Sequence, residues 1–122
     1  MSVTLLVIDD SQLARRLVRK VFEGFLPSID VVEASSGAAG VELAREKEFD
    51  VISTDLNMPG IDGIETALQI RKFRSNVPIA VVTANVQQAV RQRAEEAGIV
   101  FIAKPPSAAS VEDFLRQSKI LT

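Results

Sequence analysis

Five short runs rich in valine and isoleucine recur along this chain of 122 residues, and they limit its possible folds more than any other feature. Each run has four to six residues, which is too short for a typical helix. Their apolar residues are mostly continuous, as in strands that are buried on both faces of a sheet. The predicted strands are residues 4–8, 29–34, 51–54, 79–83 and 100–103.

Segments with helical periodicity separate the predicted strands and follow the last one. In residues 11–25 the apolar side chains recur at helical spacing, and the basic residues between them are left to solvent. The other helices are predicted over residues 37–46, 64–73 and 86–97, with a fifth that begins at Ser110. Strand and helix therefore alternate five times. This pattern predicts an α/β fold, in which right-handed crossovers join a parallel sheet to helices on both of its faces.

Residues that cap helices stand before these segments. The first helix is preceded by Asp10 and Ser11, and either of them is suited to cap it. The predicted caps of the next three helices are Ser35 or Ser36, Asp62 and Asn85. For the last helix, Ser110 at the cap and Asp113 three residues later resemble a capping box.

The composition excludes several kinds of chemistry. The chain has no cysteine and no histidine, so disulfides, thiol nucleophiles, zinc-thiolate sites and imidazole bases are excluded. Its net charge of -2 gives no overall positive field for nucleic acid or an anionic membrane. The N-terminus does not resemble a signal peptide, and the longest apolar run, residues 97–103, is too short to span a membrane. We therefore expect a soluble, cytoplasmic protein.

Polar side chains stand at the ends of four predicted strands. Asp9 and Asp10 follow the first strand, Asp55 follows the third, Thr83 ends the fourth and Lys104 follows the fifth. In an open parallel sheet, ligands bind beyond the carboxyl ends of the strands, where the winding direction reverses. The sequence therefore predicts a site in which three carboxylates, a hydroxyl and an ammonium group meet.

This set of groups is suited to phosphoryl transfer. Carboxylates that lie close together repel one another unless a proton or a cation is bound between them. Oxygen ligands at a solvent-open edge are those that Mg²⁺ prefers. A carboxylate such as Asp55 can attack phosphorus to form an aspartyl phosphate. Lys104 and Mg²⁺ would then neutralise the charge on the phosphoryl oxygens, and Thr83 would donate one hydrogen bond.

Four motifs carry these residues: VIDDS (7–11), DLNMPGIDG (55–63), VVTAN (81–85) and AKP (103–105). Together they resemble the receiver domain of two-component response regulators, close to the stand-alone chemotaxis type. The resemblance covers essentially the whole chain. It implies a doubly wound, flavodoxin-like α/β fold, with a five-stranded parallel sheet of order 2-1-3-4-5 and helices on both faces. It also implies a single receiver domain, residues 1–122, without an output domain.

The resemblance assigns a role to each residue at the predicted sheet edge. It implies that Asp55 is the phosphoacceptor. It implies that Asp9, Asp10 and Asp55 bind Mg²⁺ together with the main-chain carbonyl of Asn57. Lys104 would contact the phosphoryl group.

The resemblance also implies a switching mechanism. Thr83 would move toward the phosphoryl group, and Phe101 would rotate inward to fill the vacated space. Ala84 matches the small residue that leaves access to the acceptor. The peptide bond between Lys104 and Pro105 matches one that is often cis in the family.

The implied function is a phosphorylation-dependent signalling switch that catalyses only its own phosphorylation and dephosphorylation. The donor would be a sensor histidine kinase or a histidine phosphotransfer protein. Helix 86–97, strand 100–103 and the last helix would then present a changed surface to an unidentified downstream protein, which is a motor, a phosphorelay or an enzyme. Mg²⁺ is the expected cofactor, and neither nucleic acid nor a membrane is an expected partner.

Two other functions remain open at this point. A phosphatase with an aspartate nucleophile has a similar sheet, but such enzymes usually carry a second aspartate two residues later, and here that residue is Asn57. A flavodoxin-like binding module needs a loop rich in serine, threonine and glycine after the first strand to bind phosphate through its amides. Asp9 and Asp10 would repel phosphate there.

Two residues depart from the family pattern. Pro106 adds a second proline after Lys104, which would stiffen or reshape the loop before the last helix. Phe101 stands where the family often has tyrosine, so it has no hydroxyl for a partner.

A further group of residues is either a solvated helix face or a docking surface for the kinase: Arg15, Arg16, Arg19 and Lys20.

Overall fold

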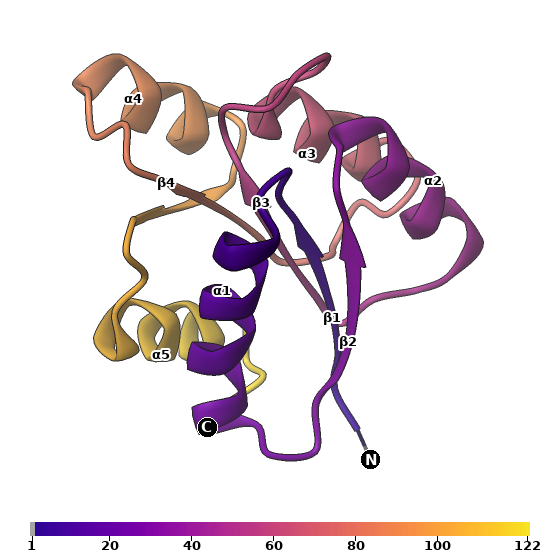
Figure 1. Ribbon diagram of the computed structural model, residues 1–122, viewed down its shortest axis with the longest axis vertical. Helices are drawn as coiled ribbons and strands as arrows, with labels where there is room; N and C mark the ends of the chain where they lie inside the picture. Colours follow the sequence, from indigo (N-terminus) through magenta and orange to yellow (C-terminus); the bar gives the residue numbers. More distant parts are fainter. Residues whose placement is uncertain (1) are drawn as a thin grey trace.

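The computed structural model describes residues 2–122 and contains a five-stranded parallel sheet between two layers of helices (Figure 1). The strands are β1 (Thr4–Ile8), β2 (Asp30–Ala34), β3 (Val51–Asp55), β4 (Ile79–Thr83) and β5 (Val100–Ala103). They lie in the order β2-β1-β3-β4-β5, and each neighbouring pair is parallel. This order confirms the doubly wound, flavodoxin-like fold expected from the sequence.

Two groups of helices cover the two faces of the sheet. The helices are α1 (Gln12–Phe25), α2 (Gly37–Glu46), α3 (Gly63–Arg71), α4 (Gln88–Glu96) and α5 (Ala108–Gln117). Helices α1 and α5 pack on one face, and α2, α3 and α4 pack on the other (Figure 1). Among residues 2–122, no helix is long and apolar enough to cross a membrane.

Alternate residues of the strands supply two separate hydrophobic cores. In β1, Leu5 and Val7 belong to the core under α1 and α5, whereas Leu6 and Ile8 belong to the core under α2, α3 and α4. The central strands β3 and β4 are buried along their whole length. Because both faces of these strands are covered, β4 is apolar from Ile79 to Val82, and β3 begins with two apolar residues and also buries the side chains of Ser53 and Thr54.

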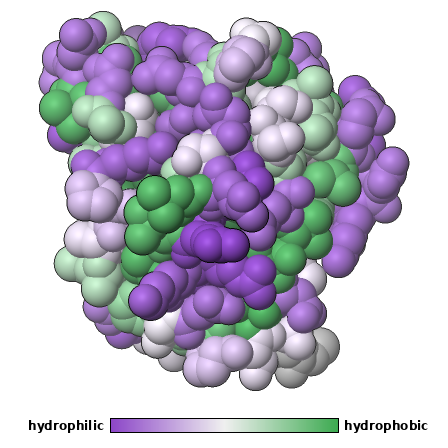
Figure 2. Space-filling model, viewed as in Figure 1, coloured by the Kyte–Doolittle hydropathy of each residue, from purple (hydrophilic) through white to green (hydrophobic). Residues whose placement is uncertain are grey.

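Helix α1 contacts the core on one side and solvent on the other. On the inner side, the rings of Phe22 and Phe114 meet edge to face with their centroids 6.4 Å apart, which joins α1 to α5. On the outer side, Leu13 and Leu17 are 67% and 48% exposed. Figure 2 shows this face of the molecule, where hydrophobic patches lie among mainly hydrophilic residues. Helix α1 therefore leaves apolar surface uncovered close to the carboxyl end of β1.

The last helix begins earlier than the sequence indicates. Its N-cap is Ser107, so the prediction that Ser110 is the cap is wrong. The Ser107 hydroxyl accepts a hydrogen bond from the Ser110 N–H (3.1 Å), and the Ser110 hydroxyl accepts one from the Ser107 N–H (3.2 Å). This reciprocal pair is a capping box that satisfies two backbone donors, with serine in the position usually held by Glu or Gln.

The start of α4 also differs from the prediction. The helix begins at Gln88 with Gln87 as its N-cap, so the prediction that Asn85 is the cap is wrong. Instead, the Asn85 side chain accepts a hydrogen bond from the Gln87 N–H (3.1 Å), which forms a turn before the helix.

Helix α3 begins one residue before the predicted range and ends two residues earlier than predicted. The caps of α1, α2 and α3 are Ser11, Ser36 and Asp62.

Gly63 brings the start of α3 against the end of β3. A Cβ atom at this position would lie 1.9 Å from the carbonyl oxygen of Asp55. The Gly63 N–H donates a hydrogen bond to the Leu56 carbonyl (2.9 Å). The backbone can follow this path only with glycine at position 63, and the path fixes the end of the strand that carries Asp55.

We expect Gly63→Ala to lower the free energy of unfolding by about 1–3 kcal/mol, because the added methyl group would collide with backbone atoms. Gly24 in α1 is the matched control, since a Cβ there would meet no atom of residues 2–122 within 4 Å. Gly24→Ala should raise stability by about 1 kcal/mol through helix propensity. Urea unfolding followed by circular dichroism measures both changes. A Gly63→Ala variant as stable as the wild type would contradict the close approach.

Candidate functional site

Three carboxylates meet at the carboxyl end of the sheet. Strands β1 and β3 pair with Ile8 opposite Thr54, so that the next residues, Asp9 and Asp55, come side by side. Oxygen atoms of Asp9, Asp10 and Asp55 lie within 4.8 Å of one another. Asp9 and Asp55 are only 2% and 9% exposed, whereas Asp10 is exposed. The acidic cluster formed by these three residues is therefore enclosed by protein on one side and open to solvent on the other.

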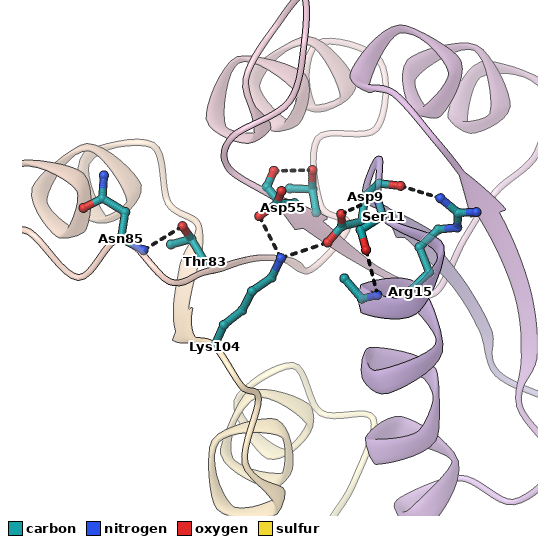
Figure 3. A network of polar contacts seen from close by, with 9 residues as sticks. Asp9, Ser11, Arg15, Asp55, Thr83, Asn85 and Lys104 are labelled. Carbon is teal, nitrogen blue, oxygen red and sulfur yellow. Dashed lines mark hydrogen bonds and ion pairs between the residues drawn. The ribbon is translucent and has the colours of Figure 1, made fainter.

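Lys104 extends between two of these carboxylates. Its Nζ atom lies 3.0 Å from Asp9 Oδ2 and 3.1 Å from Asp55 Oδ1 (Figure 3). The main-chain N–H of Lys104 donates a hydrogen bond to the Thr83 carbonyl (2.9 Å), which continues the pairing of β4 with β5 and fixes the base of the side chain. The structure thus brings Lys104 and the acidic cluster into one site, although they come from three different strand ends.

The pKa values of this site reflect an excess of negative charge. Burial and the charge of Asp9 raise the pKa of Asp55, and they outweigh the opposing effects of Lys104 and the Leu56 N–H. Burial by itself lowers the pKa of Lys104, but the hydrogen bonds and charges of Asp9 and Asp55 outweigh burial and raise it. Lys104 therefore stays protonated at neutral pH, and one ammonium group does not neutralise the cluster. A further cation would be stabilised here.

The acidic cluster fits the ligands that Mg²⁺ prefers. This ion takes oxygen ligands, keeps several waters, and is usually held by one or two carboxylates together with phosphate oxygens. The cluster offers three carboxylates, and the exposed Asp10 lies on the side from which water and phosphate oxygens would reach the ion. Asn57 is exposed in the loop two residues after Asp55. Its main-chain carbonyl as a further ligand stays a prediction.

Thr83 lies at the end of β4 and is fully buried. Its hydroxyl accepts a hydrogen bond from the main-chain N–H of Asn85 (3.0 Å). In Figure 3 the Thr83 hydroxyl is joined to Asn85 and not to the Lys104 side chain or the carboxylates. In this conformation the hydroxyl stabilises the loop between β4 and α4. The expected movement of Thr83 toward Asp55 stays a prediction.

Phe101 is half-buried in β5 and packs against the core under α4. The guanidinium carbon of Arg91, which belongs to α4, lies 4.4 Å from the centroid of the Phe101 ring. Such a cation–π contact is attractive because the ring face carries partial negative charge. The sequence does not predict this contact. Inward rotation of Phe101 would break it.

The loop after Lys104 carries both prolines. The peptide bond between Lys104 and Pro105 is cis, as it often is in the family that the sequence resembles. Pro105 and Pro106 line an apolar groove together with Leu17 and Ala84, and the groove opens beside Lys104. The second proline therefore contributes to a surface next to the acidic cluster.

Two residues that hold Asp9 in place were not predicted from the sequence. The main-chain N–H of Ser11 donates a hydrogen bond to Asp9 Oδ1 (2.9 Å), and Arg15 Nη1 donates one to the Asp9 carbonyl (2.7 Å). Arg15 also pairs with Glu33 of β2 at 2.7 Å, so it does not belong to a solvated helix face. Because Glu33 is exposed on the edge strand β2, its charge gives no sequence signal for this pairing.

The raised pKa of Asp55 predicts a pH-dependent stability in the absence of metal. The folded state binds this proton more tightly than the unfolded state, whose pKa is near 3.8. The resulting stability is present at low pH and is lost as pH rises through the folded-state pKa. Asparagine cannot ionise, so Asp55→Asn does not lose this stability at high pH. The variant should therefore become more stable relative to the wild type as pH rises. Urea unfolding in EDTA at several pH values measures the difference, and a difference that does not change with pH would contradict the assignment.

Comparisons with known proteins agree with this geometry. The family model of the response regulator receiver domain matches residues 5–116. The chemotaxis protein CheY of Halobacterium salinarum is 33% identical, over 100% of this chain and 99% of that protein. The transcriptional regulatory protein ResD of Bacillus subtilis is 40% identical, over 88% of this chain and 44% of ResD. The chain spans about a third of the length of other curated relatives, such as 29% of the cyclic di-GMP phosphodiesterase response regulator RpfG of Xanthomonas campestris.

Solved structures show the same fold. The chemotaxis protein CheY4 of Vibrio cholerae aligns with a TM-score of 0.84 at 24% identity, over 97% of this chain and 99% of that one. Receiver domains bind Mg²⁺ at an acidic cluster of the kind formed by Asp9, Asp10 and Asp55. From the match to the family model and the full-length similarity to a chemotaxis relative, we conclude that this chain belongs to the response regulator receiver domain family of two-component signalling.

Proposed function

We propose that the chain is a phosphorylation-dependent signalling switch in which Asp55 accepts a phosphoryl group. The observation that carries this proposal is the position of Lys104, whose ammonium group bridges Asp9 and Asp55 beside the open side of the acidic cluster. A phosphoryl group attached to Asp55 would bring oxygens into the space that this ammonium group already reaches. Positioning and positive charge are the main requirements of phosphoryl transfer.

In the proposed reaction, a carboxylate oxygen of Asp55 attacks the phosphorus of a phosphohistidine. The new oxygen–phosphorus bond forms as the phosphorus–nitrogen bond of the donor breaks, and its electron pair returns to the imidazole nitrogen. Lys104 would then exchange its contact with the Asp55 carboxylate for one with a phosphoryl oxygen. Its contact with Asp9, at 3.0 Å, would keep the ammonium group in place during this exchange.

Asp9, Asp10 and Asp55 would hold Mg²⁺, together with the main-chain carbonyl of Asn57. When bound, the ion supplies positive charge to the carboxylates and to the phosphoryl oxygens. The protein contributes the fixed position of Asp9, which is buried and hydrogen-bonded, and the solvent access at Asp10.

The switch would begin at Thr83. To donate a hydrogen bond to a phosphoryl oxygen, the Thr83 side chain has to rotate away from the Asn85 N–H that it now accepts from. The loop between β4 and α4 would lose one of its side-chain hydrogen bonds, and another, from the Gln87 N–H to the Asn85 side chain, would be free to rearrange. Phosphorylation thus shifts an equilibrium between two loop arrangements.

Phe101 would carry this change to the surface. Rotation of its ring into the space that Thr83 vacates would separate it from Arg91. The surface formed by α4, β5 and α5 would then differ between the two states, and a downstream protein such as a motor component, a phosphorelay protein or an enzyme would read it. In this proposal the chain is a stand-alone receiver, residues 1–122, that acts on a separate protein.

A sensor histidine kinase or a histidine phosphotransfer protein is the proposed donor, and it would phosphorylate the chain in the cytoplasm. The apolar groove lined by Leu17, Ala84, Pro105 and Pro106 supports an approach of the donor beside Lys104. Neither nucleic acid nor a membrane has a role in this proposal. Beyond its own phosphorylation and dephosphorylation, the chain would catalyse no reaction.

We expect the intact mass of the wild type to increase by one phosphoryl group after incubation with Mg²⁺ and acetyl phosphate, because Asp55 is positioned as the nucleophile. Asp55→Asn should show no increase, and EDTA should prevent the increase in the wild type. Asp113→Asn is a matched control, since Asp113 is an exposed aspartate of α5, and it should behave as the wild type. A phosphoryl group on the Asp55→Asn variant would contradict the proposal, as would turnover of a generic phosphate ester by the wild type.

A second experiment tests the switch separately from the chemistry. Thr83→Val keeps the shape of the side chain but removes the hydroxyl, so the variant should still accept a phosphoryl group. Its Asn85 amide resonance should change less on phosphorylation than that of the wild type, because the bond that is expected to break is already missing. Thr83→Ser, which keeps the hydroxyl, is the control. Equal changes in the wild type and in Thr83→Val would argue against Thr83 as the trigger.

A further inference from the structure

We propose that Arg15 is a positioning residue for metal binding, because its guanidinium group fixes the peptide that joins Asp9 to Asp10. This inference rests on the proposed Mg²⁺ site. It adds a residue of α1 that contacts neither the phosphoryl group nor the ion, and that acts through the backbone of the two ligands.

The first observation is that three hydrogen bonds hold Asp9 in addition to its contact with Lys104. Its main-chain N–H donates a hydrogen bond to the Ala34 carbonyl (3.0 Å), and its Oδ1 accepts one from the Ser11 N–H (2.9 Å). Its carbonyl accepts one from Arg15 Nη1 at 2.7 Å. Figure 3 shows Arg15 reaching back from α1 to Asp9. The Arg15 contact is the one that acts on the carbonyl, and therefore on the peptide that leads to Asp10.

The second observation is that Arg15 is itself fixed. Its Nε lies 2.7 Å from Glu33 Oε1, and its side chain is only 15% exposed. Glu33 belongs to β2 and pairs in register with Val7 of β1, two residues before Asp9. The guanidinium group therefore connects a carboxylate on the sheet to the carbonyl of the loop. Its planar arrangement of donors allows both bonds at once, which the single ammonium group of lysine would not reproduce with the same geometry.

The consequence concerns Asp10 most directly. A peptide group is planar, so fixing the carbonyl of Asp9 also fixes the direction in which the chain enters Asp10. The Asp10 carboxylate is exposed, and among residues 2–122 it has no hydrogen-bond partner that would orient it. Its position relative to Asp9 and Asp55 therefore depends on its backbone. Groups that orient metal ligands in this way commonly change metal affinity when they are removed.

Charge alone predicts the opposite result. A guanidinium group near a divalent cation repels it, so loss of the positive charge of Arg15 would by itself strengthen Mg²⁺ binding. Loss of a positioning contact would weaken it. The sign of the change in affinity therefore distinguishes the two roles.

Isothermal titration of the metal-free protein with Mg²⁺ tests the inference, because the chain has no tryptophan or tyrosine for an intrinsic fluorescence signal. The variants are Arg15→Gln, which removes the charge and the planar set of guanidinium donors, and Arg15→Lys, which removes that set of donors but keeps the charge. Arg19→Gln is the matched control. Arg19 lies one turn further along α1 and approaches the same Glu33 at 3.8 Å, but its ion pairs are with Glu23 and Glu33 and not with Asp9. Thermal unfolding without metal ensures that each variant is folded at the temperature of the titration.

We expect Arg15→Gln and Arg15→Lys to weaken Mg²⁺ binding by about tenfold or more. Arg19→Gln should bind as the wild type does. Wild-type affinity or tighter binding in Arg15→Gln would overturn the role of Arg15 and leave the metal site intact, and so would wild-type affinity in Arg15→Lys. A wild-type protein that does not bind Mg²⁺ would overturn the metal site and this inference together.

Discussion

The repulsion between Asp9 and Asp55 is the interaction on which the site depends. Parallel pairing of β1 with β3 brings these two carboxylates together at a buried edge, where like charges interact strongly. The protein places one ammonium group between them and leaves the remaining negative charge for another cation. Burial of Asp55, and then the charge of Asp9, raise the pKa of Asp55. An arrangement that is costly for the folded protein alone would therefore favour binding of an ion at this edge.

Much of this arrangement follows from the sequence. Strands that are buried on both faces are recognisable from continuous apolar runs, and a parallel sheet gathers the residues after them at one edge. Asp9, Asp10, Asp55 and Lys104 therefore come together in the structure as the sequence predicts. Each of these residues lies within two residues of a strand end, so a small error in a strand boundary does not change the conclusion.

The features that the sequence did not predict depend on contacts between distant segments or on a choice between similar local arrangements. Ser107 and Ser110 are both plausible caps, and the reciprocal pair of hydrogen bonds decides between them. Arg15 has the spacing of a solvent-facing helical residue. Its partners, Glu33 and the Asp9 carbonyl, are brought to it by the packing of α1 beside β1 and β2, which helical periodicity does not describe.

The stacking of Arg91 on Phe101 has a consequence for any protein that binds this face. While the ring lies under the guanidinium group, part of the Arg91 charge is occupied by the aromatic surface. If the ring turns inward, a cation on α4 becomes free to pair with an acidic partner. A partner would then recognise a change in available charge as well as a change in shape, and its preference between the two states would weaken as salt concentration rises.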